Sequence, residues 1–142
     1  MIDYHLTPAG EIVDGGRVLF ARAELACRAS GGLRLHPGFA DRLAELRLAY
    51  GRPMVVTSCC RSAAHNRAVG GHPRSLHVYD DSHHGAAGCL AIDVRRAAVP
   101  AHDIELVIRA LRSGWSVGQA KTFIHLDRRV DLGLPQRTFG YG

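Results

Sequence analysis

Two ionisable side chains stand in apolar segments, where each of them needs a specific partner. Asp93 lies in "CLAIDV" (89–94) and His125 lies in "TFIHLD" (122–127). A carboxylate or imidazole among such residues is costly unless it is paired, hydrogen-bonded or bound to a metal. A catalytic zinc ion takes three protein ligands, usually histidines with a carboxylate, and keeps one position open for water. Asp93 and His125 are therefore the best candidate metal ligands.

A third ligand must come from the histidines around the segment that leads to Asp93. His77 begins this segment, His83 and His84 stand midway along it, and His72 precedes it. The residue types favour His77 and leave the other three open. The alternative interpretation is that these are surface histidines and that Asp93 pairs with an arginine.

Strands and helices must position these groups, and the sequence predicts an α+β fold. Short apolar runs at 53–58, 89–96 and 122–127 are typical of strands. Apolar residues at helical spacing predict helices at 36–52 and 101–114. The first helix should bury Phe39, Leu43, Leu46 and Tyr50 and end at Gly51, and the second should bury Ile104, Val107, Ile108 and Leu111.

The remaining segments complete this expectation. Residues 20–32 predict a short helix, 59–71 a polar segment with helical character, 72–88 a loop and 131–142 an irregular tail. Strands interleaved with loops favour a small, mainly antiparallel sheet with flanking helices. At 142 residues, the chain 1–142 is expected to be one domain.

Composition limits the classes of function. The net charge of +5 favours a polyanionic partner, but the arginines are scattered and no aromatic residues are interleaved with them, so a nucleic-acid site is not expected. We expect no membrane segment and no secretory signal, and we expect a monomer. The four cysteines form no CxxC pair and are expected to be reduced and buried, with a bond from Cys27 left open. Trp115 is expected in the core rather than in the wall of a cleft.

The order of several motifs resembles the zinc D-alanyl-D-alanine carboxypeptidase family of peptidoglycan peptidases, which shares an α+β fold with hedgehog-type domains. The resemblance covers roughly residues 18–128. It rests on Ser58-x-x-Arg61, Asn66-x-x-Val69-Gly70-Gly71, Ser75-x-His77, Ala91-x-Asp93 and His125-x-Asp127. It implies Zn²⁺ bound by His77, Asp93 and His125.

The chain departs from the family pattern in two places. His77 and Asp93 are sixteen positions apart, further than is usual in the family, so residues 79–87 look like an insertion. His83 or His84 could therefore replace His77 at the metal. Several relatives carry an acid three positions before the last histidine ligand, and here that position is Thr122, which cannot act as a general base.

The resemblance implies metal-activated hydrolysis of a peptide. Asp127 lies two residues after His125, on the same face of the strand, and is either the general base or a partner that orients an imidazole. Asp80, Asp81, His83 and His84 are the other candidates for the base. Arg61 would face the substrate carboxylate or the oxyanion, and otherwise forms a structural salt bridge; Ser75 is a candidate substrate contact.

The expected substrate is a peptidoglycan stem peptide, cut either at a terminal D-alanine or at an internal bond. Such an enzyme, made in the cytoplasm without a signal peptide, would reach the cell wall after lysis, by delivery in a particle (as a phage endolysin would) or by non-classical export. The competing hypothesis is a non-enzymatic wall-binding or phage structural domain of the same fold, which the missing acid at Thr122 favours.

Overall fold

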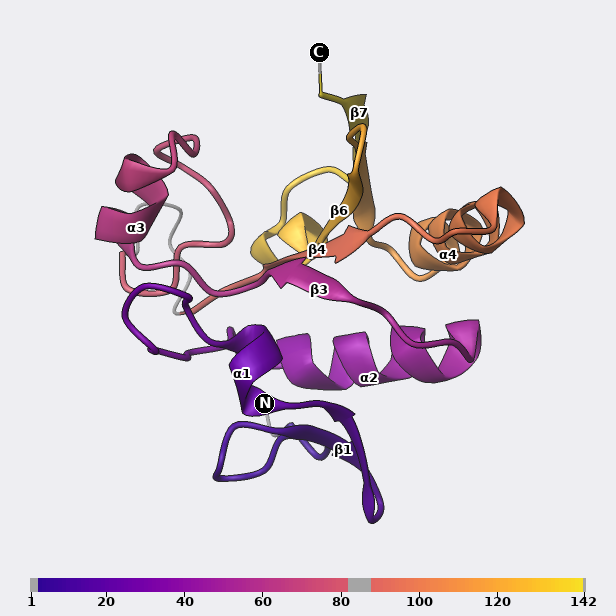
Figure 1. Cartoon of the computed structure of the whole chain (residues 1–142), viewed down its shortest axis with the longest axis horizontal. Helices are drawn as coiled ribbons and strands as arrows, with labels where there is room; N and C mark the ends of the chain where they lie inside the picture. The colour runs from indigo at the N-terminus through magenta and orange to yellow at the C-terminus, as the bar shows by residue number, and fades with distance from the viewer. Residues whose placement is uncertain (1–2, 82–87, 142) are drawn as a thin grey trace.

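A five-stranded sheet carries most of the candidate ligands. In the computed structural model, which describes residues 3–81 and 88–141, the sheet has the order β3–β4–β6–β5–β7 (Figure 1). Neighbouring strands are antiparallel except for β5 and β7, which are parallel. The predicted α+β fold with a mainly antiparallel sheet is confirmed. The strands are β3 (Val56–Ser58), β4 (Ala91–Arg95), β5 (Ser116–Gln119), β6 (Phe123–Asp127) and β7 (Thr138–Gly140).

The helices and a separate hairpin surround this sheet. Helix α2 lies below the sheet in Figure 1, and the hairpin of β1 and β2 lies beyond it. The bounds are β1 (Ile12–Asp14), β2 (Arg17–Phe20), α1 (Arg22–Leu25), α2 (Phe39–Tyr50), α3 (Ala63–Ala68), α4 (Pro100–Arg112) and a 3₁₀ turn η1 (Arg129–Leu132). Helix α2 ends at Gly51, whose φ of 74° favours glycine, as predicted.

The two faces of the central strands have different side chains because successive residues of a strand point in opposite directions. Ile92 of β4 and Ile124 and Leu126 of β6 belong to the hydrophobic core, which they share with Leu43 of α2 and Leu106 of α4. The alternate residues of the same strands carry the candidate site. One face therefore stabilises the domain, and the other is available for chemistry.

Helix α4 corrects one prediction. Its core residues are Leu106 and Ala110, whereas Ile104 is 61% exposed and Ile108 is 42% exposed. Val107 and Leu111 are partly buried and pack against the core, as predicted, whereas Ile104 and Ile108 face outward.

Other local predictions also need correction. The helix expected over 20–32 is a single turn, Arg22–Leu25, and the tail expected to be irregular contains β7. The hairpin and β5 were not predicted. By contrast, Trp115 is buried in the core, where it meets Phe39 edge-to-face with the ring centroids 5.7 Å apart, as expected.

All four cysteines are free and buried, in line with the expectation. Within the ranges 3–81 and 88–141, no helix is long and apolar enough to cross a membrane.

Candidate metal centre

One cross-strand row places the candidate site. Ser58 of β3 pairs with Asp93 of β4, Asp93 pairs with His125 of β6, and His125 pairs with Gly118 of β5. Gly118 in turn pairs with Phe139 of β7. Directly opposite residues of antiparallel strands have neighbouring side chains. The register of the sheet therefore brings Asp93 and His125 together although they are far apart in the sequence.

His77 reaches the same point from the loop that follows α3. Its backbone N–H donates to Ser75 Oγ (3.2 Å), and its carbonyl accepts from the backbone N–H of Arg61 (2.9 Å). Its ring Nδ1 lies 2.7 Å from the carbonyl oxygen of Cys59. A carbonyl can only accept, so Nδ1 carries the proton and Nε2 presents a lone pair. The loop thus fixes both the position and the tautomer of His77.

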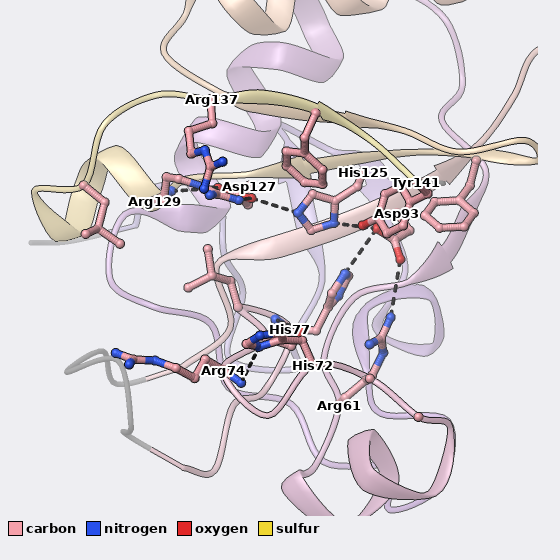
Figure 2. A pocket seen from close by; sticks show the side chains of 17 residues that line it. Arg61, His72, Arg74, His77, Asp93, His125, Asp127, Arg129, Arg137 and Tyr141 are labelled. Atoms are coloured by element: carbon pink, nitrogen blue, oxygen red, sulfur yellow. Dashed lines mark hydrogen bonds and ion pairs between the residues drawn. The ribbon is translucent and has the colours of Figure 1, made fainter.

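The three groups converge on one oxygen atom. Oδ1 of Asp93 lies 3.1 Å from Nε2 of His77 and 2.9 Å from Nδ1 of His125 (Figure 2). In neutral His77 the lone pair of Nε2 faces this carboxylate oxygen, and the two repel each other. A bound cation would remove this repulsion. Zinc–nitrogen and zinc–oxygen bonds of about 2.0–2.1 Å give tetrahedral edges of roughly 3.3–3.4 Å, close to these separations. His77, Asp93 and His125 therefore fit a metal ion.

Burial and neighbouring charges tune these ligands. Burial lowers the pKa of His77, although the charge of Asp93 acts to raise it. His77 is therefore neutral, with Nε2 unprotonated. Burial opposes ionisation of Asp93, but the imidazoles of His77 and His125 outweigh it and hold the pKa of Asp93 below its usual range. Burial opposes protonation of His125, but its hydrogen bonds to Asp127 and Asp93 outweigh burial and raise its pKa to about 8. A metal binds neutral imidazole and ionised carboxylate, so it would displace the proton of His125 Nδ1.

A second layer fixes His125. Its Nε2 donates to Asp127 Oδ2 (2.8 Å), which leaves Nδ1 to face Asp93. Arg129 donates to both oxygens of Asp127, from Nε to Oδ1 (2.9 Å) and from Nη2 to Oδ2 (2.7 Å). Although burial opposes ionisation, Arg129 and His125 hold the pKa of Asp127 below its usual range. Asp127 is 0% exposed, so the geometry favours its orienting role over its role as a base.

Arg61 is held on the other side of Asp93. Its Nε donates to Ser58 Oγ (3.1 Å), its Nη1 to Asn66 Oδ1 (3.1 Å) and its Nη2 to Asp93 Oδ2 (3.4 Å). A Cβ atom at Gly71 would lie 2.1 Å from Asn66 Oδ1, so the backbone there must lack a side chain. The ion pair with Asp93 expected as the alternative role of Arg61 is present, and the guanidinium also lines the cavity.

The ligands lie in the wall of a cavity of about 660 Å³. Four arginines line it with the two aspartates, so its charge is positive. Ser75 and His72 also contribute to the wall. Figure 2 shows Arg129 and Arg137 on one side of the ligands and Arg61 and Arg74 on the other. The apolar lining residues are Leu76, Phe123, Leu134, Phe139 and Tyr141, with Tyr141 carrying a hydroxyl.

The other predicted residues lie elsewhere. His83 and His84 are outside the described residues, so the structure does not compare them with His77. Thr122 is exposed and is not among the residues that line the cavity. Asp80 accepts the backbone N–H of Ala63 at the start of α3.

The C-terminal contribution to the cavity was not foreseen. Arg129, Arg137, Phe139 and Tyr141 all line it. Arg137, Phe139 and Tyr141 alternate along the chain, a spacing typical of one face of a strand. This period of two was the available signal for β7.

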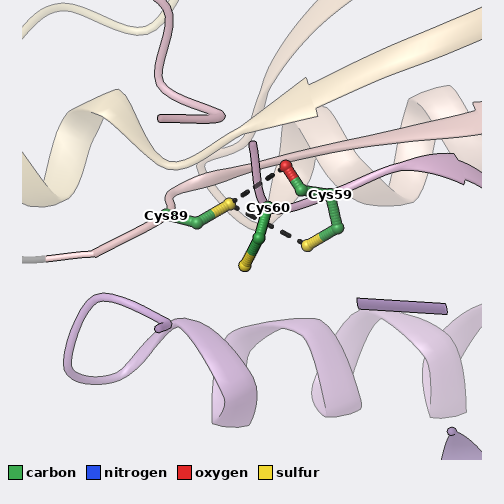
Figure 3. A group of neighbouring side chains, drawn as sticks. All are labelled: Cys59, Cys60 and Cys89. Carbon is green, nitrogen blue, oxygen red and sulfur yellow. Dashed lines mark hydrogen bonds between the residues drawn. The ribbon is translucent and has the colours of Figure 1, made fainter. Parts of the chain in front are cut away.

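A second group of ligand-type side chains lies nearby, in the core. The Sγ atoms of Cys59, Cys60 and Cys89 lie within 4.8 Å of one another, and those of Cys59 and Cys89 are 3.9 Å apart (Figure 3). All three thiols belong to the hydrophobic core.

Comparison with known families is consistent with the motifs. The sequence model described as Peptidase M15 matches residues 18–127, more than half of the chain. No curated protein and no solved structure gives a significant match.

Proposed function

Because the chain belongs to the peptidase M15 family and is therefore a metallopeptidase, we propose that it hydrolyses stem peptides of bacterial peptidoglycan with zinc bound by His77, Asp93 and His125. The observation that carries this proposal is the lone pair of His77 Nε2, set against Asp93 Oδ1 at the cavity wall. Bound zinc supplies a Lewis acid that lowers the pKa of water and polarises a carbonyl group.

The surrounding residues hold the ligands in position. Asp127 and Arg129 keep His125 Nδ1 directed at the metal position. The carbonyl of Cys59 does the same for His77 Nε2. Arg61 presents fixed positive charge beside Asp93 and is the contact we assign to a substrate carboxylate.

Proton transfer needs a group outside this set, because Asp127 has both oxygens engaged by Arg129 and His125. Of the described cavity residues, His72 is the imidazole that does not belong to the ligand group. Its Nδ1 accepts the backbone N–H of Arg74 (3.0 Å), and its carbonyl accepts from Asn66 Nδ2 (2.9 Å). The ring is thus oriented, and histidine is the side chain suited to proton exchange near neutral pH.

The charge of the cavity supports an acidic peptide as the substrate. Within residues 3–81 and 88–141, the guanidinium groups of Arg74 and Arg137 form no ion pair, and both line the cavity. Stem peptides carry free carboxylates, including the terminal one that a carboxypeptidase would bind; Ser75 lies in the same wall. With such a substrate, we propose that the enzyme acts as a monomer at the cell wall, which it reaches after lysis, by particle delivery or by non-classical export.

The test is zinc-dependent product release from purified stem peptides, followed by mass spectrometry. The wild type should lose activity on chelation and regain it when zinc is added back. His77→Ala should lose both zinc and activity, whereas His102→Ala, on α4 away from the cavity, should retain both. A zinc-loaded wild type that binds peptidoglycan but releases nothing would instead favour the non-enzymatic wall-binding domain.

A further inference from the structure

The C-terminal segment Arg129–Tyr141 builds one wall of the cavity. The family match ends at residue 127, so this wall lies outside the matched region. It nevertheless supplies Arg129, Leu134, Arg137, Phe139 and Tyr141 to the cavity lining. Chemistry contributed by this wall is therefore a property of this chain that the family match does not describe.

The wall is built into the sheet. Strand β7 pairs with β5, the N–H of Val117 donates to the carbonyl of Arg137 (3.0 Å), and that of Tyr141 donates to the carbonyl of Gln119 (2.9 Å). A Cβ atom at Gly118 would lie 2.5 Å from the ring of Phe139 and 3.0 Å from that of Tyr141. The missing side chain at Gly118 thus makes room for both rings.

These rings cover the metal ligand His125. The ring centroid of Phe139 lies 5.7 Å from that of His125, and the centroid of Tyr141 lies 6.5 Å from it. Phe139 and Tyr141 also contact each other, with centroids 5.6 Å apart. Figure 2 shows Tyr141 beside His125 and Asp93. The aromatic pair therefore sets the phenol ring of Tyr141 beside the ligand group, in the wall of the cavity.

Among the residues that the structure describes, none hydrogen-bonds to the hydroxyl of Tyr141, a residue that is 49% exposed. Burial and the nearby charge of Asp93 raise the pKa of Tyr141 to about 12, although the charge of Arg61 acts to lower it. The hydroxyl therefore keeps its proton. Arg61, the other donor at this point, uses one N–H of each nitrogen for Ser58, Asn66 and Asp93, and its other two N–H groups are assigned to the substrate carboxylate.

We propose that the Tyr141 hydroxyl donates a hydrogen bond to the carbonyl oxygen of the scissile peptide as that oxygen becomes an oxyanion. Water adds to the carbonyl carbon, and the electron pair of the C=O bond moves onto the oxygen. The pair returns as the C–N bond breaks, and the leaving nitrogen takes a proton that came from the water. Tyr141 keeps its own proton throughout. This assignment rests on the proposed peptidase function.

A preorganised oxyanion donor acts on the transition state more than on the substrate. Tyr141→Phe removes only the hydroxyl, so zinc content and KM should stay within about twofold while kcat falls roughly 100-fold. Tyr4→Phe, at a side chain that is 83% exposed, is the matched control and should behave as the wild type.

Binding provides a second readout that needs no turnover. A phosphinate analogue of a D-alanyl-D-alanine peptide mimics the tetrahedral oxyanion, and calorimetry on the zinc-loaded full chain measures its affinity. Tyr141→Phe should weaken phosphinate binding by a factor similar to the loss in kcat and leave binding of the product peptide unchanged. Equal phosphinate affinities of Tyr141→Phe and the wild type would overturn the proposal. A wild type that releases no product would refute the peptidase function separately.

Discussion

The cluster of His77, Asp93 and His125 and the cluster of Cys59, Cys60 and Cys89 each bring three buried ligand-type side chains within 4.8 Å. They are neighbours, because the carbonyl of Cys59 accepts from His77 Nδ1 (2.7 Å) and from the Cys89 thiol (3.4 Å). Their surroundings nevertheless differ. The first cluster lines a cavity with arginines, whereas the second is enclosed in the apolar core.

The protonation states of the two clusters differ as well. The first has an ionised carboxylate and an imidazole lone pair directed at it. In the second, Cys89 donates to the carbonyl of Ala91 (3.1 Å), and burial raises its pKa, so it is a neutral thiol. Hydrogen bonds to Cys60 and Cys89, together with burial, raise the pKa of Cys59. Cys60 differs, because hydrogen bonds from Cys59 and Cys89 outweigh burial and lower its pKa to about 4.

A thiol must lose its proton to bind a metal, and the enclosed core resists the charge that results at Cys59 and Cys89. Figure 3 shows the sulfur atoms of Cys59 and Cys60 directed toward the helix below them. Both clusters thus bring ligand-type side chains close to one another. Unpaired lone pairs, charge and access distinguish the metal centre from a packed core.

The largest effect should follow from removing the shared carboxylate. Asp93→Asn keeps the size of the side chain but removes the charge that both imidazoles face. We expect loss of bound zinc and a fall in activity of roughly 1,000-fold or more, measured by elemental analysis and product release. Asp103→Asn on α4, where the carboxylate accepts the N–H of Ala97, is the control. Full zinc content in Asp93→Asn would show that the metal binds at another cluster.

A smaller effect should follow from Asp127→Asn, which weakens the hold on His125 without removing a ligand. We expect zinc affinity to fall about 10- to 100-fold, because the imidazole loses its charged partner. Titration of the metal-free protein with zinc measures this change. At saturating zinc, kcat should return close to the wild-type value. A persistent loss of kcat would instead identify Asp127 as the general base.

The smallest effect is expected in the cysteine cluster. Cys89→Ala removes a buried sulfur from the core and should lower the free energy of unfolding by about 1–2 kcal/mol. Urea denaturation measures this loss, and Val55→Ala, at a side chain that is 50% exposed, is the control. Zinc content should not change. A drop in zinc content would show that the thiols take part in metal binding and would remove the contrast between the clusters.

The sequence predicted the metal cluster better than the cavity around it. Asp93 and His125 stood out because each interrupts an apolar strand, and this signal is local. The choice of His77 depended on the motif with Ser75, whose hydroxyl indeed accepts the N–H of His77. No local pattern indicated that the register of β4 and β6 would set Asp93 opposite His125.

The parts that were missed depend on long-range packing. Whether residues 138–140 form a strand depends on β5, which offers an edge and a glycine at position 118. The outward direction of Ile104 depends on how α4 lies against the core. Local spacing alone sets neither: the period of two at Arg137, Phe139 and Tyr141 indicates a strand but not the partner that turns it into a cavity wall.

The most direct test of the contrast between the two clusters is X-ray absorption at the zinc edge of the zinc-loaded protein. Nitrogen and oxygen ligands lie at about 2.0–2.1 Å from zinc, whereas sulfur lies at about 2.3 Å. Binding by His77, Asp93 and His125 predicts a single nitrogen and oxygen shell without sulfur. A sulfur shell would place the metal among Cys59, Cys60 and Cys89 and would contradict the proposed centre.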